Sequence, residues 1–267
     1  MNEAEFLFTE VLNCNRLSLF LNKESLLDKE KSTLIASVLK RRIKAEPIQY
    51  ILGKTEFLGL EFKVNKDVFI PRPETEILVE TAIRQLSALS YKLSALNILD
   101  LGTGSGCIAV SLAKLLPNAK IDAIDISRKT LEIARENAIL NSVNINFIQG
   151  DLFNAYSLQL TAYDLIISNP PYIPTTEIAN LQPEIGYEPA IALDGGRDGL
   201  DFYRRIVALA PNYLNKCGFL IMEMGFNQKD EIKKIFYESK DFQIIEMVKD
   251  YNNIDRVIVA RKIGENG

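Results

Sequence analysis

The spacing of hydrophobic positions changes along the chain and divides it into two parts. Over the first 45 residues apolar side chains recur every three or four positions, which predicts helices over Glu3–Leu12 and Glu24–Lys44. From residue 96 onward, short apolar runs alternate with helical stretches. The expected strands are Asn97–Leu101, Lys120–Asp125, Ile145–Gln149, Tyr163–Ser168, Gly218–Met224, Phe242–Met247 and Arg256–Ala260, and the expected helices are Gly106–Leu116, Arg128–Leu140, Leu200–Leu214 and Gln228–Lys240. This alternation predicts an α/β fold: a mostly parallel sheet of these seven strands with helices on both faces.

A connector joins the two parts. Residues 48–70 are expected to be extended, and apolar residues on both sides of Gly59 predict a short β-hairpin. Pro73 suits the first turn of a helix over Glu74–Leu89, because its missing N–H would have no partner there. The predicted domains are a helical N-terminal domain over residues 1–45, a hairpin and linker over 46–72, and an α/β domain over 73–267.

Composition narrows the possible chemistry. The chain of 267 residues has a net charge of −4 and no histidine, which excludes Ser-His-Asp and Cys-His sites and histidine-ligated metal centres. Its three cysteines, Cys14, Cys107 and Cys217, are too far apart for a CxxC metal site or a disulfide framework, so we expect no metal. The acidic N-terminus does not resemble a signal peptide, and no apolar stretch approaches the ~18 residues that span a bilayer. We expect a cytoplasmic protein.

Charge is distributed unevenly. Residues 1–45 carry eight Lys/Arg and six Asp/Glu, which leaves 23 Lys/Arg and 29 Asp/Glu for the remainder, or −6. A basic cluster of Lys40, Arg41, Arg42 and Lys44 ends the second predicted helix. These cations either contact an acidic partner or stabilise the C-terminus of the helix.

A glycine-rich loop follows Asn97–Leu101, the first predicted strand of the α/β domain. Gly102, Thr103, Gly104, Ser105 and Gly106 lie between a buried strand and a helix, where backbone N–H groups and the helix N-terminus are expected to face a ligand. Dinucleotide sites usually place the third glycine one position later. The spacing found here instead suits S-adenosylmethionine, which has no pyrophosphate.

Two further strand ends supply candidate cofactor contacts. Asp125 ends the second strand and can accept hydrogen bonds from ribose hydroxyls, or it can simply help to cap the next helix; Asp122 is expected on the opposite face. After the third strand, Asp151 could accept from an adenine amino group while Leu152 or Phe153 covers the ring, or these residues could belong to the core.

The strongest motif is Asn169-Pro170-Pro171-Tyr172 at the end of the fourth strand. Its prolines stiffen the loop and have no N–H, so the Asn169 side-chain oxygen and the Pro170 carbonyl can accept both hydrogens of a planar NH2 group, on which Tyr172 can stack. Such a nitrogen is a poor nucleophile, so we expect the protein to act mainly by alignment, with nitrogen and methyl carbon about 3–3.5 Å apart. The motif predicts methyl transfer from S-adenosylmethionine, with Asn169, Pro170 and Tyr172 as catalytic residues.

The chain resembles the HemK/PrmC protein-(glutamine-N5) methyltransferases, which modify peptide chain release factors. The motifs that carry this resemblance are Gln49–Gly53, Glu56–Gly59, Ile70–Glu76, Gly102–Gly106, Asn169–Tyr172, Glu188-Pro189 and Leu193–Gly199. The Asn-Pro-Pro-Tyr motif is shared with adenine-N6 methyltransferases, whereas the Pro71–Glu76 and Gly195–Gly199 segments are specific to this family.

The resemblance implies a class I, Rossmann-like methyltransferase domain preceded by a helical domain that docks the substrate. The substrate would be the glutamine of the Gly-Gly-Gln motif in class I release factors, and the product S-adenosylhomocysteine. The implied cofactor contacts are Gly102–Gly106, Asp125, Leu152 and Asn169, and the implied substrate contacts are Asn169, Pro170, Pro171 and Tyr172. Arg72, Glu74 and Thr75 would lie near the active site. We expect a monomer that binds neither membrane nor nucleic acid.

Three other functions compete with this interpretation. Adenine-N6 methylation of DNA or RNA would use the same Asn169 loop on a flipped base, but it needs a basic track that the −6 charge of residues 46–267 does not suggest. A non-catalytic binding module would be expected to have lost the glycine loop or Asn169. A nicotinamide-dependent oxidoreductase is disfavoured by the glycine spacing.

Overall fold

The computed structural model describes residues 3–21, 26–88, 96–154 and 162–264. Residues Glu24 and Leu89, which the sequence analysis assigned to helices, lie outside this part. None of the helices in the described part is both long and apolar enough to cross a membrane.

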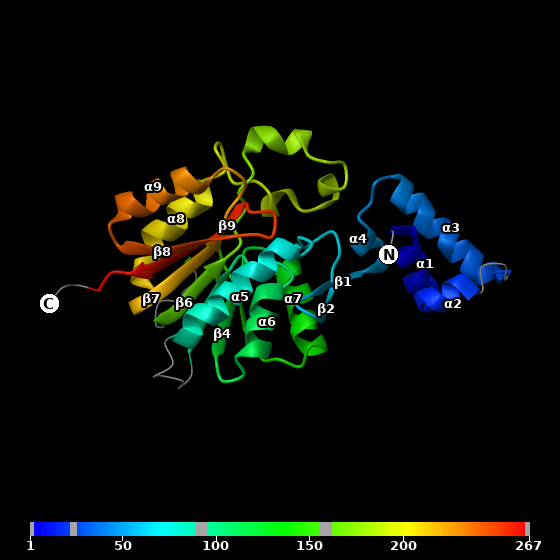
Figure 1. Ribbon diagram of the computed structural model, residues 1–267, viewed down its shortest axis with the longest axis horizontal. Helices are drawn as coiled ribbons and strands as arrows, with labels where there is room; N and C mark the ends of the chain where they lie inside the picture. The colour runs from blue at the N-terminus through cyan, green and yellow to red at the C-terminus, as the bar shows by residue number, and fades with distance from the viewer. Residues whose placement is uncertain (1–2, 22–25, 89–95, 155–161, 265–267) are drawn as a thin grey trace.

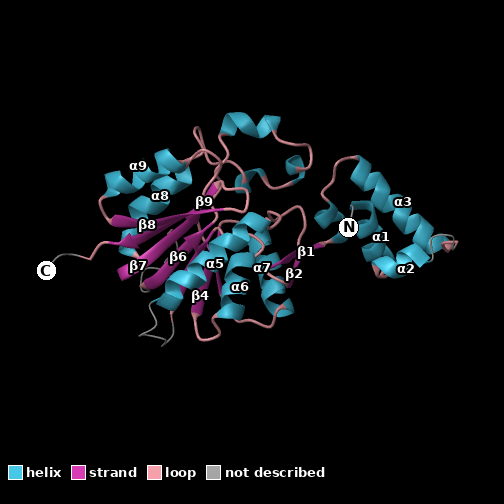
Figure 2. Ribbon diagram, viewed as in Figure 1, coloured by secondary structure: helices cyan, strands magenta, loops and turns pink. Residues whose placement is uncertain are grey.

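A seven-stranded sheet forms the centre of the larger domain (Figures 1 and 2). Its strands are β3 (Asn97–Leu101), β4 (Lys120–Asp125), β5 (Asn146–Gln149), β6 (Tyr163–Ser168), β7 (Leu214–Glu223), β8 (Phe242–Lys249) and β9 (Asp255–Lys262), in the order β5-β4-β3-β6-β7-β9-β8. Strand β9 pairs antiparallel with both β7 and β8, and all the other pairs are parallel. The predicted mostly parallel sheet is therefore confirmed.

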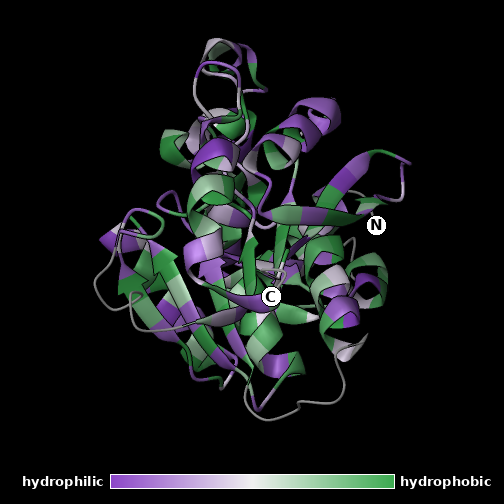
Figure 3. Cartoon of the chain, turned by 90° about the vertical axis from the view of Figure 1, so that its left-hand side faces the viewer, coloured by the Kyte–Doolittle hydropathy of each residue, from purple (hydrophilic) through white to green (hydrophobic). Residues whose placement is uncertain are grey.

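Helices cover both faces of this sheet because strand side chains alternate between them. Ile98 faces α5 (Pro73–Ala88), α6 (Cys107–Leu115) and α7 (Arg128–Leu140), whereas Leu99 faces α8 (Asp201–Leu209) and α9 (Lys229–Ser239). Figure 3 shows hydrophobic residues along the strands between these two helical layers. An apolar core covers each face of the sheet, so the ends of the strands, and not the faces of the sheet, are available for a site.

In the larger domain, two boundaries of predicted elements differ from the structure by four or more residues. The predicted helix Leu200–Leu214 ends at Leu209 and continues as a 3-10 turn, Ala210–Asn212, because Pro211 has no N–H with which to continue the α-helical bonds. Strand β7 begins at Leu214, four residues before the predicted Gly218, since Leu214 already pairs with Tyr163.

Four helices form the N-terminal part beside the sheet domain: α1 (Glu3–Leu12), α2 (Arg16–Leu21), α3 (Lys29–Ile43) and α4 (Ile48–Leu52) (Figure 1). Leu7, Val38 and Ile51 share their small core. Helix α3 begins five residues later than predicted, because Asp28 caps it by accepting from the backbone N–H of Lys31 at 2.7 Å. The pattern analysis did not predict α2, and its extended connector over residues 48–70 is wrong at Ile48–Leu52, which form α4.

The basic cluster at the end of α3 is partly neutralised within the chain. Arg41 donates to Glu46, and Arg42 bridges Glu3 and Glu184. Glu184 belongs to the segment between β6 and α8, which also contains the 3-10 helices η2 (Thr175–Asn180), η3 (Ile185–Tyr187) and η4 (Ala190–Ala192). Arg42 therefore connects the N-terminal helices to the larger domain.

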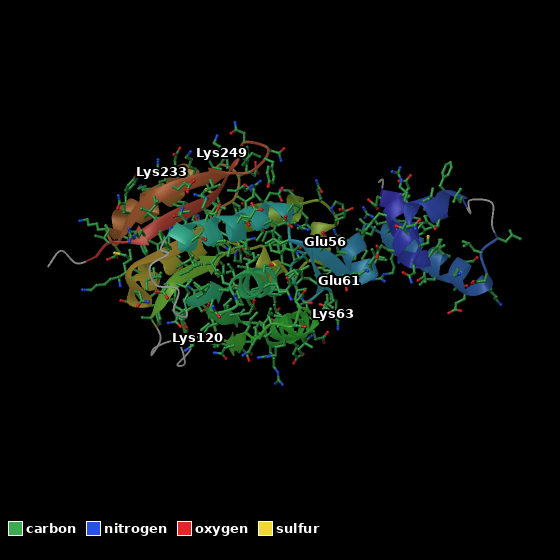
Figure 4. All side chains as sticks on the ribbon, turned by 60° about the horizontal axis from the view of Figure 1, so that its bottom comes forward. Glu56, Glu61, Lys63, Lys120, Lys233 and Lys249 are labelled. Atoms are coloured by element: carbon green, nitrogen blue, oxygen red, sulfur yellow. The ribbon has the colours of Figure 1, made fainter. Side chains whose placement is uncertain are left out.

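The predicted hairpin is present as β1 (Lys54–Phe57) and β2 (Leu60–Lys63), and its labelled residues lie between the N-terminal helices and α7 (Figure 4). At its turn, the backbone N–H of Leu58 donates to Glu76 of α5 at 2.8 Å. Fully buried Asn137 of α7 accepts from the Lys63 N–H and donates to the Lys63 and Ser105 carbonyls. One side chain thus joins the hairpin to the glycine loop.

Replacing Asn137 with alanine should lower the free energy of unfolding by about 2–4 kcal/mol, because it leaves buried backbone groups without partners. Urea denaturation followed by circular dichroism measures the change. Asn146→Ala is the matched control, since Asn146 is exposed and donates only to Asp122, and it should cost less than about 1 kcal/mol. Equal losses in the two variants would contradict the role of Asn137.

Candidate active site

A cavity of about 350 Å³ opens at the carboxyl edge of the parallel strands. It lies where β4 and β5 continue the sheet on one side of β3, and β6 and β7 continue it on the other. This reversal of strand order is the usual ligand site of open α/β sheets. The predicted site residues that line the cavity are Gly102, Thr103, Gly104, Ser105, Asp125, Asp151, Leu152, Asn169, Pro170, Pro171 and Tyr172, together with Arg72 and Thr75.

The glycine loop shapes the cavity by its backbone conformation. Gly102, Gly104 and Gly106 all have positive φ, at 71°, 56° and 81°, which other residues adopt only with strain. A Cβ on Gly106 would also lie 3.2 Å from Cβ of Ala134 on α7. Glycine is therefore required here for the turn and for close packing of the loop on α7.

The expected donors of this loop are mostly engaged within the protein. The N–H groups of Gly102 and Thr103 both donate to the Ile124 carbonyl, that of Gly104 donates to Asp125, and that of Gly106 donates to the Thr103 carbonyl. The predicted ligand-facing N–H groups of Gly102, Thr103, Gly104 and Gly106 are therefore used inside the protein. The first three of them fasten the loop to β4.

Asp125 holds two neighbouring segments at once. Its oxygens accept from the N–H of Gly104 at 3.0 Å and of Ser127 at 2.9 Å, while Ser127 caps α7. Burial raises the pKa of the Asp125 carboxyl. A carboxylate has about four lone-pair sites, so both oxygens can still accept from a ribose diol. Asp122 accepts from Tyr163 and Asn146 and does not line the cavity.

The loop after β5 contributes Asp151 and Leu152. Leu152 lines the cavity with φ of 51°, whereas the ring of Phe153 is buried and stacks on Tyr213 with centroids 4.6 Å apart. Asp151 accepts from Arg205 of α8 at 2.7 Å, and both side chains lie at the cavity wall. Of the two predicted ring contacts, Leu152 is the one positioned to touch a ligand.

The Asn169–Tyr172 loop is supported from behind by the segment that contains Gly195 and Gly199. A Cβ on Gly195 would lie 2.8 Å from Cα of Tyr172, and one on Gly199 would lie 2.4 Å from its carbonyl oxygen. Gln228 donates to the same carbonyl at 2.9 Å. Within the described residues, neither Oδ1 of Asn169 nor the Pro170 carbonyl accepts a hydrogen bond. Two acceptors are thus available on a rigid loop.

Residues at the start of α5 connect this loop to two buried carboxylates that the sequence analysis did not single out for a role. Arg72 pairs with Glu188, whose side chain is 1% exposed and also accepts from the Ile70 N–H. Thr75 accepts from Nδ2 of Asn169 and donates to Glu223. A charged residue at the end of the apolar run Phe219–Met222 is the signal that could have indicated Glu223. Glu74 does not line the cavity.

Asp100, under the glycine loop, is the most deeply buried carboxyl of the site. Thr103 donates to its Oδ2 at 2.6 Å, while Oδ1 has no partner in the described part of the chain. Burial raises its pKa from the ordinary 3.8 to about 7. Across the same part of the chain, no group of His, Cys, Asp and Glu side chains could hold a metal ion.

Comparison with known proteins identifies relatives over nearly the whole chain. The PrmC N-terminal domain matches residues 1–53, and the Methyltransferase small domain matches residues 75–183. Proteins named release factor glutamine methyltransferase from Geobacter sulfurreducens and Thermodesulfovibrio yellowstonii are 43% and 42% identical to this chain. The alignments cover 97% and 98% of this chain and 88% and 92% of theirs.

Solved structures share the fold at low sequence identity. The hMettl16 catalytic domain, in complex with a MAT2A 3'UTR hairpin, has a TM-score of 0.61 at 17% identity, and the alignment covers 82% of each chain. The T. thermophilus 16S rRNA methyltransferase RsmC, in complex with AdoMet and guanosine, has a TM-score of 0.54 at 17% identity, covering 78% of this chain and 49% of that one. The predicted class I methyltransferase fold is confirmed.

The Asp100 carboxyl predicts a specific pH dependence of stability. Because its pKa is higher in the folded than in the unfolded chain, its contribution is present below about pH 4 and is lost as the pH rises through about 7. Asp100→Asn does not titrate, so its free energy of unfolding relative to the unsubstituted protein should increase from about pH 5 to about pH 8. Urea denaturation at several pH values measures this difference. A flat difference would contradict the burial of an ionised Asp100.

Proposed function

The chain belongs to the release factor glutamine methyltransferase family, and from this premise we propose that it methylates N5 of the glutamine in the Gly-Gly-Gln motif of class I peptide chain release factors. The observation that carries the proposal is the pair of available acceptors, Oδ1 of Asn169 and the Pro170 carbonyl, on one rigid wall of the cavity. A primary amide has two hydrogens in one plane, and this pair of acceptors suits it.

The protein residues act on the glutamine by orientation. With both N–H groups donating to Asn169 and Pro170, the amide plane would be fixed, and the ring of Tyr172, which also lines the cavity, would cover it. S-adenosylmethionine, when bound, supplies a methyl group activated by the sulfonium charge. Because the amide nitrogen and the methyl carbon would already be held in line, less entropy is lost in reaching the transition state. The methylated nitrogen would then release its extra proton to water.

The cofactor is proposed to lie along the carboxyl ends of β3, β4 and β5. The Asp125 carboxylate would accept from the ribose hydroxyls, Leu152 would cover the adenine ring, and the Gly102–Gly106 backbone would lie against the methionine part. The carboxylates of Asp125 and Asp151 and the apolar side chain of Leu152, which all line the cavity, suit a nucleoside with a diol. Asn169 would face both the cofactor and the amide.

The N-terminal helices are proposed to dock the release factor. Helix α2 exposes Leu17, Phe20 and Leu21, at 66%, 67% and 71% of their surface, which suits contact with a protein partner. The charge of −6 over residues 46–267 gives no support to a nucleic-acid substrate. We also propose that the protein acts as a cytoplasmic monomer. Adenine-N6 methylation remains the alternative that the experiment below distinguishes.

The proposed function is tested with methyl-labelled S-adenosylmethionine and a class I release factor. Label should enter the intact factor but not the same factor with its Gly-Gly-Gln glutamine replaced, and the Asn169→Ala variant should transfer none to either. Scintillation counting of the separated proteins measures the transfer. Label in DNA or RNA offered in parallel, with none in the release factor, would overturn the proposal in favour of adenine.

The proposed ribose contact makes a separate prediction. Asp125→Ala should weaken S-adenosylmethionine binding by about 1–3 kcal/mol, because a charged acceptor of two hydroxyls is lost. Isothermal titration calorimetry measures the affinity. Asp122→Ala, on the same strand but outside the cavity, is the matched control and should bind normally. Equal affinities in both variants would assign the ribose contact to another residue.

A further inference from the structure

Glu223 is a fully buried carboxylate at the end of β7, 1% exposed, and it faces the start of α5. Its Oε2 accepts from the Thr75 hydroxyl at 2.7 Å, and its Oε1 accepts from the Tyr172 hydroxyl at 3.5 Å. Glu223 itself does not line the cavity, whereas both of its partners, Thr75 and Tyr172, do. A buried charge is costly unless it is hydrogen-bonded, so the positions of both hydroxyl protons depend on it.

The direction of these hydrogen bonds fixes the orientation of Asn169. A threonine hydroxyl has one proton, and an ionised carboxylate can only accept. Because Thr75 donates its proton to Glu223, its oxygen can only accept from the other side. The group of Asn169 that lies 3.1 Å from Oγ1 of Thr75 must therefore be the Nδ2 amino group. Oδ1 is then directed away from Thr75.

We propose that Glu223 is a positioning residue, which acts through Thr75 to present the oxygen of Asn169, and not its amino group, to the substrate amide. This inference rests on the proposed function. If the Asn169 amide were reversed, its NH2 group would face the NH2 group of glutamine, and two donors would meet. One of the two hydrogen bonds that align the nucleophile would be lost.

Other groups around Glu223 set its charge. Arg256 of β9 and the hydroxyl of Tyr172 favour the carboxylate, whereas Glu74 of α5 opposes it. The phenol of Tyr203 and the thiol of Cys107 also lie close enough to Glu223 to interact with it electrostatically. Burial is the largest influence and raises the pKa of Glu223 to about 7. Protonation would remove an acceptor and free Thr75 to donate toward Asn169.

The test compares Thr75→Val, which removes the hydroxyl at nearly constant volume, with Thr75→Ser, which keeps it. We expect kcat for release factor methylation to fall at least about tenfold in Thr75→Val and to return to within about threefold of the unsubstituted enzyme in Thr75→Ser. The dissociation constant for S-adenosylmethionine should stay unchanged in both. Thr81→Val, a buried threonine six residues further along α5, is the matched control and should keep full activity.

Glu223 itself is tested by Glu223→Met, which removes both acceptors, and by Glu223→Gln, which keeps one oxygen. We expect a kcat loss of at least about tenfold for the methionine variant, a smaller loss for glutamine, and no further loss when Glu223→Met is combined with Thr75→Val. Because only the ionised Glu223 keeps Thr75 as a donor toward it, kcat of the unsubstituted enzyme should rise through about pH 7, and this rise should disappear in Glu223→Gln.

The outcomes separate this inference from the function on which it rests. An active unsubstituted enzyme with a Thr75→Val variant of similar kcat, or with additive losses in the double variant, would overturn the role of Glu223 alone. An unsubstituted enzyme that labels no release factor would overturn both. If Thr75→Val loses cofactor affinity through misfolding, the pH profile of Glu223→Gln decides: an unchanged rise through about pH 7 overturns the role of Glu223.

Discussion

The parallel pairing of β3 with β6 is the constraint on which the site depends. These two strands are neighbours at the centre of the sheet, and the hydroxyl of Ser168 donates to the Leu101 carbonyl at 2.7 Å. The glycine loop leaves one strand at the residue after Leu101, and the Asn169 loop leaves the other at the residue after Ser168. A single ladder of backbone hydrogen bonds therefore sets the separation between the cofactor wall and the acceptor wall of the cavity.

The start of α5 then connects this edge to the rest of the molecule. Within one turn, Arg72 pairs with Glu188, Thr75 links Asn169 to Glu223, and Glu76 accepts from the tip of the hairpin. A short segment thus fixes the acceptor loop, the segment before α8 and the connector to the N-terminal helices.

Three buried carboxylates lie around the cavity. Asp100, Glu188 and Glu223 all have raised pKa values because burial disfavours their charge, and each accepts a hydrogen bond from a nearby side chain. Such groups cost stability, and they are retained where orientation matters. Nitrogen methylation depends on alignment more than on acid or base chemistry. Such an enzyme is therefore expected to hold its substrate with rigid hydrogen-bond networks.

The sequence by itself determined the strands and the loops that leave them. The bounds of Asn97–Leu101 and Lys120–Asp125 were predicted correctly, and Asn169–Tyr172 is identifiable because its chemistry is local. Only the tertiary structure decided which polar groups are hydrogen-bonded within the protein and which face the cavity. The N–H groups of Gly102, Thr103 and Gly104 turn toward β4, and Glu223 contacts Thr75, 148 residues away in the sequence. Such contacts depend on the packing of α5 against β7, which no local pattern specifies.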